Sequence, residues 1–411
     1  MNEKLFNRNF VFLILGQVSS LVGNYTLKFA LSMYVLEQTG SASLFAGLMA
    51  AAMLPTILLT PFGGILADRA DRRAIMVALD SLSGLSVLLA ALAFPGRGQG
   101  IGVIGALLVA LSVLSAFESP TVQACVPQML TGENVLRGNA MVSQVASLTA
   151  LVTPFLGSLF YTAVGLRPVL YTTVGCFFLT ALLECFIRLP RRQPGPRSRL
   201  ADVVRDDFAL TLRFMRQEQP ATLRMLVLAA LVNLLITGLV VVGFPYLVRT
   251  VLGLSANHYG AAESAMGVAA VLGAVLVTLL AGKMRPRHLT LLILLVGFPL
   301  LPGGAAFLFP LGSLGRYLVL VAAFCACQLG GSIFSTYAIT LIQSRTPEQL
   351  MGKVMSCVYT VALCAQPLGQ ILYGGLLDRF SDSVHWVLLP SGLLVCPLGL
   401  AFSRFFRQLE H

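Results

Sequence analysis

Residues Gly64–Arg73 read GILADRADRR and form a short charged connection between two long apolar stretches, residues 43–66 and 74–94. Apolar stretches of this length, separated by only a few residues, are typical of consecutive helices that cross a membrane. The connection is highly charged, while the stretches around it contain almost no other charge. The fold is therefore expected to be a series of membrane spans joined by short loops.

The whole chain has the composition of a protein with many membrane spans. Of its 411 residues, 57% are hydrophobic and only 11% are charged. A bilayer core of about 30 Å needs roughly 20 apolar residues per helix, and the long apolar runs lack the two-residue alternation of a β-barrel. We predict an all-α fold with twelve transmembrane helices in two pseudo-symmetric six-helix bundles. The predicted spans are 10–36, 43–66, 74–94, 101–124, 139–164, 168–188, 223–247, 259–281, 289–309, 317–341, 354–376 and 384–403.

The basic residues predict the orientation of these spans. The predicted loops alternate between the two sides of the membrane. The side that contains the N-terminus has 22 of the 28 Lys and Arg residues. The others are Arg97, Arg167, Arg249, Arg316, Arg379 and Lys28. Because basic loops stay in the cytoplasm, both termini are expected there, in a bacterial plasma membrane. The net charge of +11 thus reflects loop topology and predicts no nucleic-acid partner.

An internal repeat predicts the domain organisation. An offset of 214 residues places Ile65–Arg73 over Leu279–Arg287, and two basic short loops then coincide. The prediction is an N-terminal bundle at 1–188, a linker at 189–222 and a C-terminal bundle at 223–411. The linker contains RRQPGPRSR and an expected amphipathic helix around residues 200–215. Chance similarity between apolar sequences is the alternative.

The decapeptide closely resembles the signature loop of the major facilitator superfamily. PTVQACVPQMLTGENVLRGNAM from Pro120 and TPFLGS from Thr153 resemble its branch of macrolide-efflux proteins and the enterobactin exporter. The resemblance implies a gating role for the loop residues Gly64, Asp68, Arg69, Arg72 and Arg73. Asp71 stands where the family pattern prefers glycine.

The physics of Asp68 favours the same role. A carboxylate at a helix C-terminus is disfavoured by the macrodipole, so it needs a positive partner. The arginines that follow could supply one, and so could the positive start of the helix expected near Val354. Asp80 and Glu118 lie near the same ends of their helices, and pairing with Arg69, Arg72 or Arg73 is expected. Glu184 lies four residues before Arg188, which predicts a local ion pair.

Polar groups inside the other spans are the candidates for binding substrate or protons. Lys28 could attract an anionic substrate, pair with a carboxylate or extend to the interface. Glu263 could be its partner, a proton carrier or a solvated residue at the mouth. The uncharged candidates are Asn24, Tyr25, Asn233 and Gln328. A helix-packing motif is expected at Pro154, Gly157, Pro367 and Gly369.

These features predict a secondary transporter, and the family resemblance implies proton-coupled efflux of a lipophilic or amphipathic small molecule, such as a drug, macrolide or siderophore. A lipid transporter of the same fold and a small-molecule importer stay open as alternatives, and a membrane-embedded enzyme is remote. The expected partners are the substrate, protons or another coupling ion and membrane lipids, with the protein acting as a monomer. No cofactor or metal is expected, because the eight cysteines lack metal-ligand spacing and are interpreted as buried packing residues.

Overall fold

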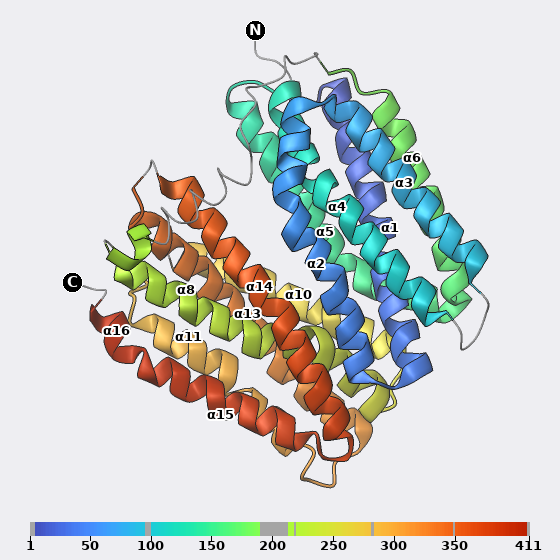
Figure 1. The fold of residues 1–411 in the computed structure, drawn as a ribbon. Coiled ribbons are helices and arrows are strands. Elements are labelled where there is room, and N and C mark those ends of the chain that lie inside the picture. Colours follow the sequence, from blue (N-terminus) through green and yellow to red (C-terminus); the bar gives the residue numbers. More distant parts are fainter. Residues whose placement is uncertain are drawn as a thin grey trace. The chain divides into compact units, whose positions relative to one another are not determined.

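The computed structural model of the chain describes residues 5–94, 100–189, 213–217, 219–280, 283–347 and 350–408, without the side chains of Asp68 and Arg69. These residues are almost entirely helical (Figure 1). Twelve helices within the described ranges are long and apolar enough to cross a membrane. The predicted all-helical fold with twelve spans is confirmed. Most of the predicted linker at 189–222 lies outside the described residues. Of its expected helix around residues 200–215, the structure describes only residues 213–215, which belong to a helical segment at 213–217.

The first six spans are single helices, and three of the last six are divided into segments. The first six are α1 (Arg8–Thr39), α2 (Ala42–Arg69), α3 (Arg72–Ala93), α4 (Ile101–Met129), α5 (Glu133–Val164) and α6 (Leu166–Cys185). The others are α8 (Pro220–Val232) with its continuation to Val251, α10 (Ala256–Leu279), α11 (His288–Gly297) with α12 (Leu300–Ala305), α13 (Ser313–Ser344), α14 (Met351–Arg379) and α15 (His385–Ala401) followed by α16 (Ser403–Gln408).

The chain divides into two compact units. Unit 1 comprises Met1–Gly40, Ala51–Pro196 and Ala256–Ser264, and unit 2 comprises Ser41–Ala50, Arg197–Ser255 and Ala265–His411. The start of α2 therefore belongs to unit 2, and the start of α10 belongs to unit 1. In unit 1, α1 packs against α5 and α6, and α3 packs against α4 and α6 (Figure 1).

Local sequence explains where several helices begin and end. Asn7 caps α1, since its side chain accepts a hydrogen bond from the Phe10 amide at 2.9 Å. Gly40 ends the same helix with φ at 59°, a conformation that glycine adopts without strain. Asp71 caps α3 by accepting from the amides of Arg73 and Ala74. Asp71, which stands where the family pattern prefers glycine, therefore serves as the N-cap of α3.

Two spans are less regular than their apolar runs predict. The span predicted at 223–247 continues beyond α8 as π-helical segments at Asn233–Thr237, Leu239–Gly243 and Leu247–Val251. The span predicted at 289–309 is divided between α11 and α12 at Phe298–Pro299. Proline lacks the amide that continues a helix, which explains the second break.

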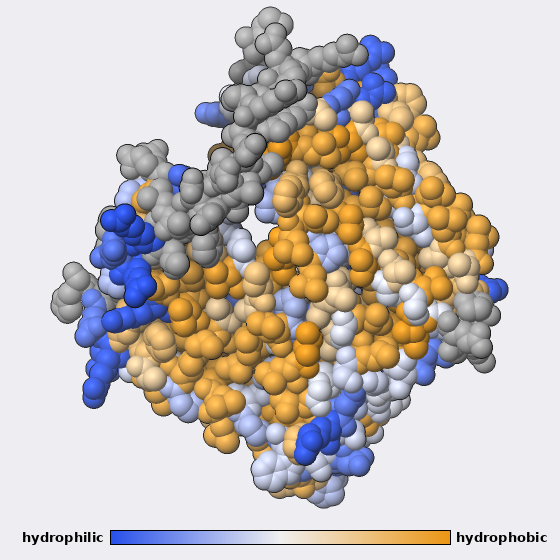
Figure 2. All heavy atoms as spheres, in the orientation of Figure 1, coloured by the Kyte–Doolittle hydropathy of each residue, from blue (hydrophilic) through white to orange (hydrophobic). Residues whose placement is uncertain are grey.

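Apolar side chains cover much of the outer surface of the helices, as the visible face in Figure 2 shows. Exposed large examples include Leu58, Leu148, Leu272, Leu291 and Trp386. Exposure of this extent is unfavourable in water and is expected where helices face lipid. The cysteines only partly follow the prediction of buried packing, because Cys185 and Cys364 are exposed.

Close helix packing in unit 2 depends on two glycines. A Cβ on Gly369 of α14 would overlap the carbonyl oxygen of Leu234, and one on Gly238 would overlap the backbone of Gly369. The two backbones can therefore approach only because neither residue has a side chain. In unit 1, the predicted motif residue Gly157 lies in ordinary contact with Thr26 of α1, and the carbonyl of Pro154 lies against Gly260.

The start of α2 is held within unit 2 by Asp378, near the end of α14. The Asp378 carboxylate accepts hydrogen bonds from the Ala42 amide at 2.6 Å, the Ser43 amide at 2.9 Å and the Ser41 hydroxyl at 2.7 Å, and another from the Ser43 hydroxyl. Free amides at a helix start carry partial positive charge, so a carboxylate there is favourable. Sequence reasoning missed this residue, although GGLLDR at Gly374–Arg379 resembles GGILADR at Gly63–Arg69.

We expect Asp378→Ala to lower the stability of the purified protein by about 2 kcal/mol, since the hydrogen bonds to a charged acceptor are lost and the helix start is left uncapped. Thermal unfolding in detergent measures the effect. Asp382→Ala is the matched control, because Asp382 is exposed in the short 3-10 helix Ser381–Ser383 that follows α14. Equal unfolding temperatures for the two variants would show that the cap contributes nothing.

Candidate functional site

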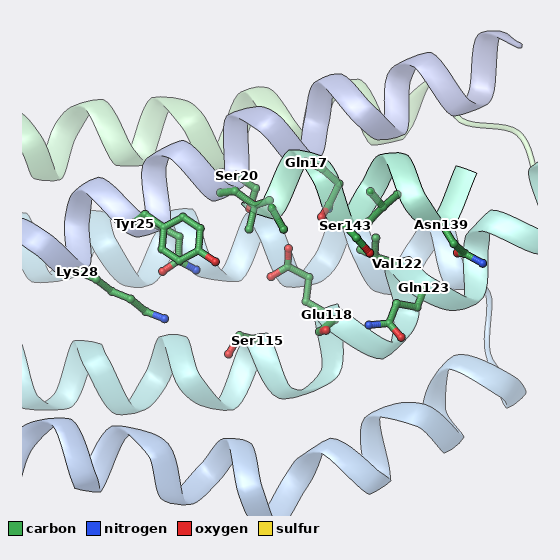
Figure 3. Close-up of a pocket in the computed structure, with 15 residues that line it drawn as sticks. Gln17, Ser20, Tyr25, Lys28, Ser115, Glu118, Val122, Gln123, Asn139 and Ser143 are labelled. Atoms are coloured by element: carbon green, nitrogen blue, oxygen red, sulfur yellow. The ribbon is translucent and has the colours of Figure 1, made fainter. Parts of the chain in front are cut away.

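Unit 1 contains a cavity of about 590 Å³ between α1, α4 and α5. Figure 3 shows polar side chains pointing into it from these helices. The cavity has the size of a small-molecule pocket. Its polar lining residues are Gln17, Ser20, Asn24, Tyr25, Lys28, Ser115, Glu118, Ser119, Gln123, Asn139 and Ser143.

Most of the residues that line this pocket are polar. Only Leu21, Val122, Val142 and Ala146 are apolar. The polar side chains of α1, α4 and α5 all point into the same pocket. The sequence alone does not show that these three helices turn their polar sides toward one another. The lining of this pocket suits a molecule with several polar groups.

Three predicted candidates, Asn24, Tyr25 and Lys28, line the pocket together. They lie within five residues of one another on α1, close to one face of the helix. Lys28 is exposed to the cavity, and its charge and that of Glu118 are close enough to influence each other. Lys28 therefore lies beside a carboxylate at the pocket, which is the arrangement expected for one of its three alternatives.

Glu118 lines this pocket, and no pairing with Arg72 or Arg73 is found among the described side chains, which do not include that of Arg69. It is half-buried on α4, and Figure 3 shows its carboxylate pointing toward Gln17 and Ser20 of α1. Its side chain hydrogen-bonds to Ser20. The predicted pairing with Arg72 or Arg73 is wrong for this structure, because the side chain is turned into the cavity.

Asp80 and Glu184 are also placed differently from the prediction. Asp80 of α3 is 0% exposed and accepts a hydrogen bond from the Ser20 hydroxyl at 3.1 Å. Its carboxyl group also hydrogen-bonds to that of Glu184, which is 1% exposed. The predicted Glu184–Arg188 ion pair is absent because α6 ends at Cys185, so the four-residue spacing is not helical.

The loop arginines bind helix carbonyl groups. Arg72 is buried and donates from Nε to the Ala67 carbonyl at 2.6 Å and from Nη1 to the Ala124 carbonyl at 2.5 Å. Arg73 donates to the Cys185 carbonyl at the end of α6. A cation is favourable at a helix C-terminus. Gly64 is half-buried with open space beside it, and the side chains of Asp68 and Arg69 lie outside the described ones.

The remaining candidates do not line this pocket. Glu263, in the part of α10 that belongs to unit 1, hydrogen-bonds to Tyr259, and pairing with Lys28 is not found. Tyr259 in turn stacks on Phe29 of α1. Asn233 and Gln328 belong to unit 2. Asn233 donates to the Ala229 carbonyl at 3.0 Å and accepts from the Thr237 hydroxyl at 3.2 Å, and both partners lie within its own span.

Twelve candidate spans in the described ranges define a multi-pass membrane protein, and the polar pocket of unit 1 has the size of a small molecule. Residues 13–369 match the Major Facilitator Superfamily, so the chain belongs to this family of transporters and is not an enzyme. In the residues that the structure describes, no cluster of side chains could hold a metal ion.

Two relatives are similar over nearly their full length. The chain is 24% identical to macrolide efflux protein A of Streptococcus pyogenes, covering 93% of this chain and 92% of that protein. It is 27% identical to the multidrug efflux pump Tap of Mycolicibacterium fortuitum, covering 97% and 96%.

Solved structures show the same fold. An auto-inhibited peptide transporter of the POT family matches with a TM-score of 0.74 at 14% identity, covering 98% of this chain and 97% of that one. A bacterial homologue of the human lysosomal transporter Spinster, in an inward-facing conformation, matches with a TM-score of 0.71 at 15% identity, covering 98% of both chains.

Proposed function

We propose that the chain is a secondary active transporter that exports a small amphipathic molecule in exchange for protons. The observation that carries this proposal is the unit 1 pocket, where the carboxyl group of Glu118 and the ammonium group of Lys28 face the same space. Ionisable side chains inside a membrane span are unfavourable, so they are expected where they serve a transport step. Export is supported by the two efflux proteins to which the chain is similar.

The polar lining of the pocket limits the chemical class of the proposed substrate. A purely lipophilic molecule would leave the amide and hydroxyl groups of Gln17, Asn24 and Ser143 without partners, which is unfavourable in a closed pocket. We therefore propose a substrate that carries several hydrogen-bonding groups beside an apolar surface. The sequence contains no phosphate-binding loop, so an ion gradient is the proposed energy source.

The proposed orientation places the Ala70–Asp71 loop and both termini in the cytoplasm of a bacterial cell, on the basis of the basic loops. Gly64, Asp68, Arg69, Arg72 and Arg73 keep their proposed gating role. In this role, Arg72 would brace the end of α2 against α4 through its two carbonyl contacts.

Inverted membrane vesicles from cells that express the protein test this function. A panel of fluorescent amphipathic drugs is offered while the vesicle interior is acidified. We expect at least one compound to accumulate inside, and a protonophore should abolish the accumulation. Vesicles without the protein are the control. Accumulation that survives the protonophore, or uptake only into right-side-out vesicles, would contradict proton-driven export.

A further inference from the structure

Three carboxyl groups in unit 1 form a continuous chain with the hydroxyl group of Ser20. Glu118 at the pocket contacts Ser20, Ser20 contacts Asp80, and Asp80 contacts Glu184. These residues come from four different helices, α4, α1, α3 and α6. Asp80 and Glu184 lie behind the pocket lining, fully buried.

The contact between Asp80 and Glu184 requires a proton. Two ionised carboxylates offer only acceptors, so a hydrogen bond between them needs one of them to be protonated. Each also has one buried oxygen, Oδ2 of Asp80 and Oε2 of Glu184, that receives no N–H or O–H donor. A single shared proton provides the missing donor.

The cations near this chain have other contacts. Arg72, which lies near the Cys125 thiol, donates to the Ala67 and Ala124 carbonyl groups, and Lys28 lies beside Glu118.

Asp80 faces the Ser20 hydroxyl and the carboxyl groups of Glu118 and Glu184. Glu184 faces Asp80, Glu118 and the Cys185 thiol, with the Cys125 thiol near it. Within the described part of the chain, neither Asp80 nor Glu184 forms an ion pair. Two adjacent carboxylates that are shielded from water and lack an ion pair do not both stay ionised.

Ser20 connects the buried pair to the pocket. Its one hydroxyl hydrogen is donated to Asp80, so its contact with Glu118 is a hydrogen bond when Glu118 is protonated and donates to the Ser20 oxygen. A proton can then pass from Glu118 to the Ser20 oxygen while the Ser20 hydrogen moves to Asp80. The O–H bond of Glu118 breaks, one O–H bond forms and one breaks at the Ser20 oxygen, and an O–H bond forms on Asp80. Glu118 is left as a carboxylate, and the net charge is conserved.

A further buried group beside this chain is available to a ligand. Gln17 lies one turn before Ser20 on α1 and lines the same pocket. Its side chain is 6% exposed, and its Nε2 has no hydrogen-bond acceptor in the structure. Gln17 therefore supplies an unused donor at the place where Glu118 enters the pocket.

We propose that Asp80 and Glu184 form a proton-binding site, and that Ser20 relays protons between this site and Glu118. The binding of a proton by the pair is independent of the direction of transport. Its use in coupling depends on the proposed proton-coupled export.

Infrared spectroscopy of the purified protein at neutral pH tests the site through the carbonyl stretch of protonated carboxyl groups. We expect the wild type to show this band, and Asp80→Asn combined with Glu184→Gln to reduce its area. Glu133→Gln is the matched control, because Glu133 is exposed on α5 and paired only with Arg137. A wild type without the band, or a band with the same area in the double variant, would overturn the proposal.

Ser20→Ala keeps the test valid if the double variant does not fold. The variant removes one hydroxyl group from a buried position, so we expect the band to remain but to change frequency as Asp80 loses its donor. An unchanged frequency would contradict the relay.

The two proposals can fail separately. If the band is present while drug accumulation does not depend on the proton gradient, the proton-binding site is supported and the proposed function is wrong. If accumulation is proton-driven without the band, coupling depends on other groups.

Discussion

Vesicles that contain Glu118→Gln are expected to accumulate substrate at about one tenth of the wild-type level or less under the same pH gradient. The glutamine keeps the shape and hydrogen-bonding capacity of the side chain, but it neither binds nor releases a proton in the working range. Coupling free energies between linked sites are typically 1–3 kcal/mol, which corresponds to 5–150-fold. The loss of coupling should therefore be large even though the protein folds.

The position of Glu118 makes this variant more informative than others in the pocket. It is a pocket-lining residue that is joined both to Lys28 by charge and to Ser20 by a hydrogen bond. Exchange of labelled for unlabelled substrate, without a pH gradient, should continue in Glu118→Gln, since the fold and most polar contacts are kept. Glu133→Gln is the control for the substitution itself. Wild-type accumulation in Glu118→Gln would remove Glu118 from the coupling mechanism.

Gly369→Ala is expected to have the largest effect on folding. The added methyl group would meet the backbone of Leu234, which cannot move aside as a flexible side chain can. Overpacking of a tight contact costs about 1–3 kcal/mol and sometimes more. We expect a lower yield of monodisperse protein and a lower unfolding temperature in detergent.

Gly375→Ala is the matched control on the same helix. Gly375 lies six residues after Gly369 on α14, is exposed, and has no atom within 4 Å of the position that a Cβ would take. Replacing a helical glycine by alanine in open space stabilises a helix by about 0.5–1 kcal/mol. The two variants should thus shift the unfolding temperature in opposite directions. A wild-type unfolding temperature for Gly369→Ala would show that the helices separate easily at this contact.

The length and apolarity of the runs were sufficient to predict the membrane spans. The runs do not report backbone regularity, so the π-helical segments after Val232 and the break at Phe298–Pro299 were missed. Pro299 was a usable signal for the break. Asp71 directly before an apolar run was also a usable signal, for the cap of α3.

The candidate site was predicted in part. Asn24, Tyr25 and Lys28 lie on one helix within a few residues, so their common pocket follows from local geometry. Glu118 was expected to pair with the loop arginines because it lies near the same end of its helix. The position of a residue along a helix does not determine the direction of its side chain. The Asp80–Glu184 pair joins α3 to α6 and depends on tertiary packing that the sequence of one chain does not reveal.

If substrate and protons are exchanged, a substrate gradient alone should drive protons across the membrane. Purified protein is reconstituted in liposomes with a pH-sensitive dye, a substrate from the vesicle panel is added on one side, and no pH gradient is imposed. We expect a proton flux in the direction opposite to the substrate flux, and a strongly reduced proton flux in Glu118→Gln. Substrate movement without a pH change would contradict the exchange of substrate for protons.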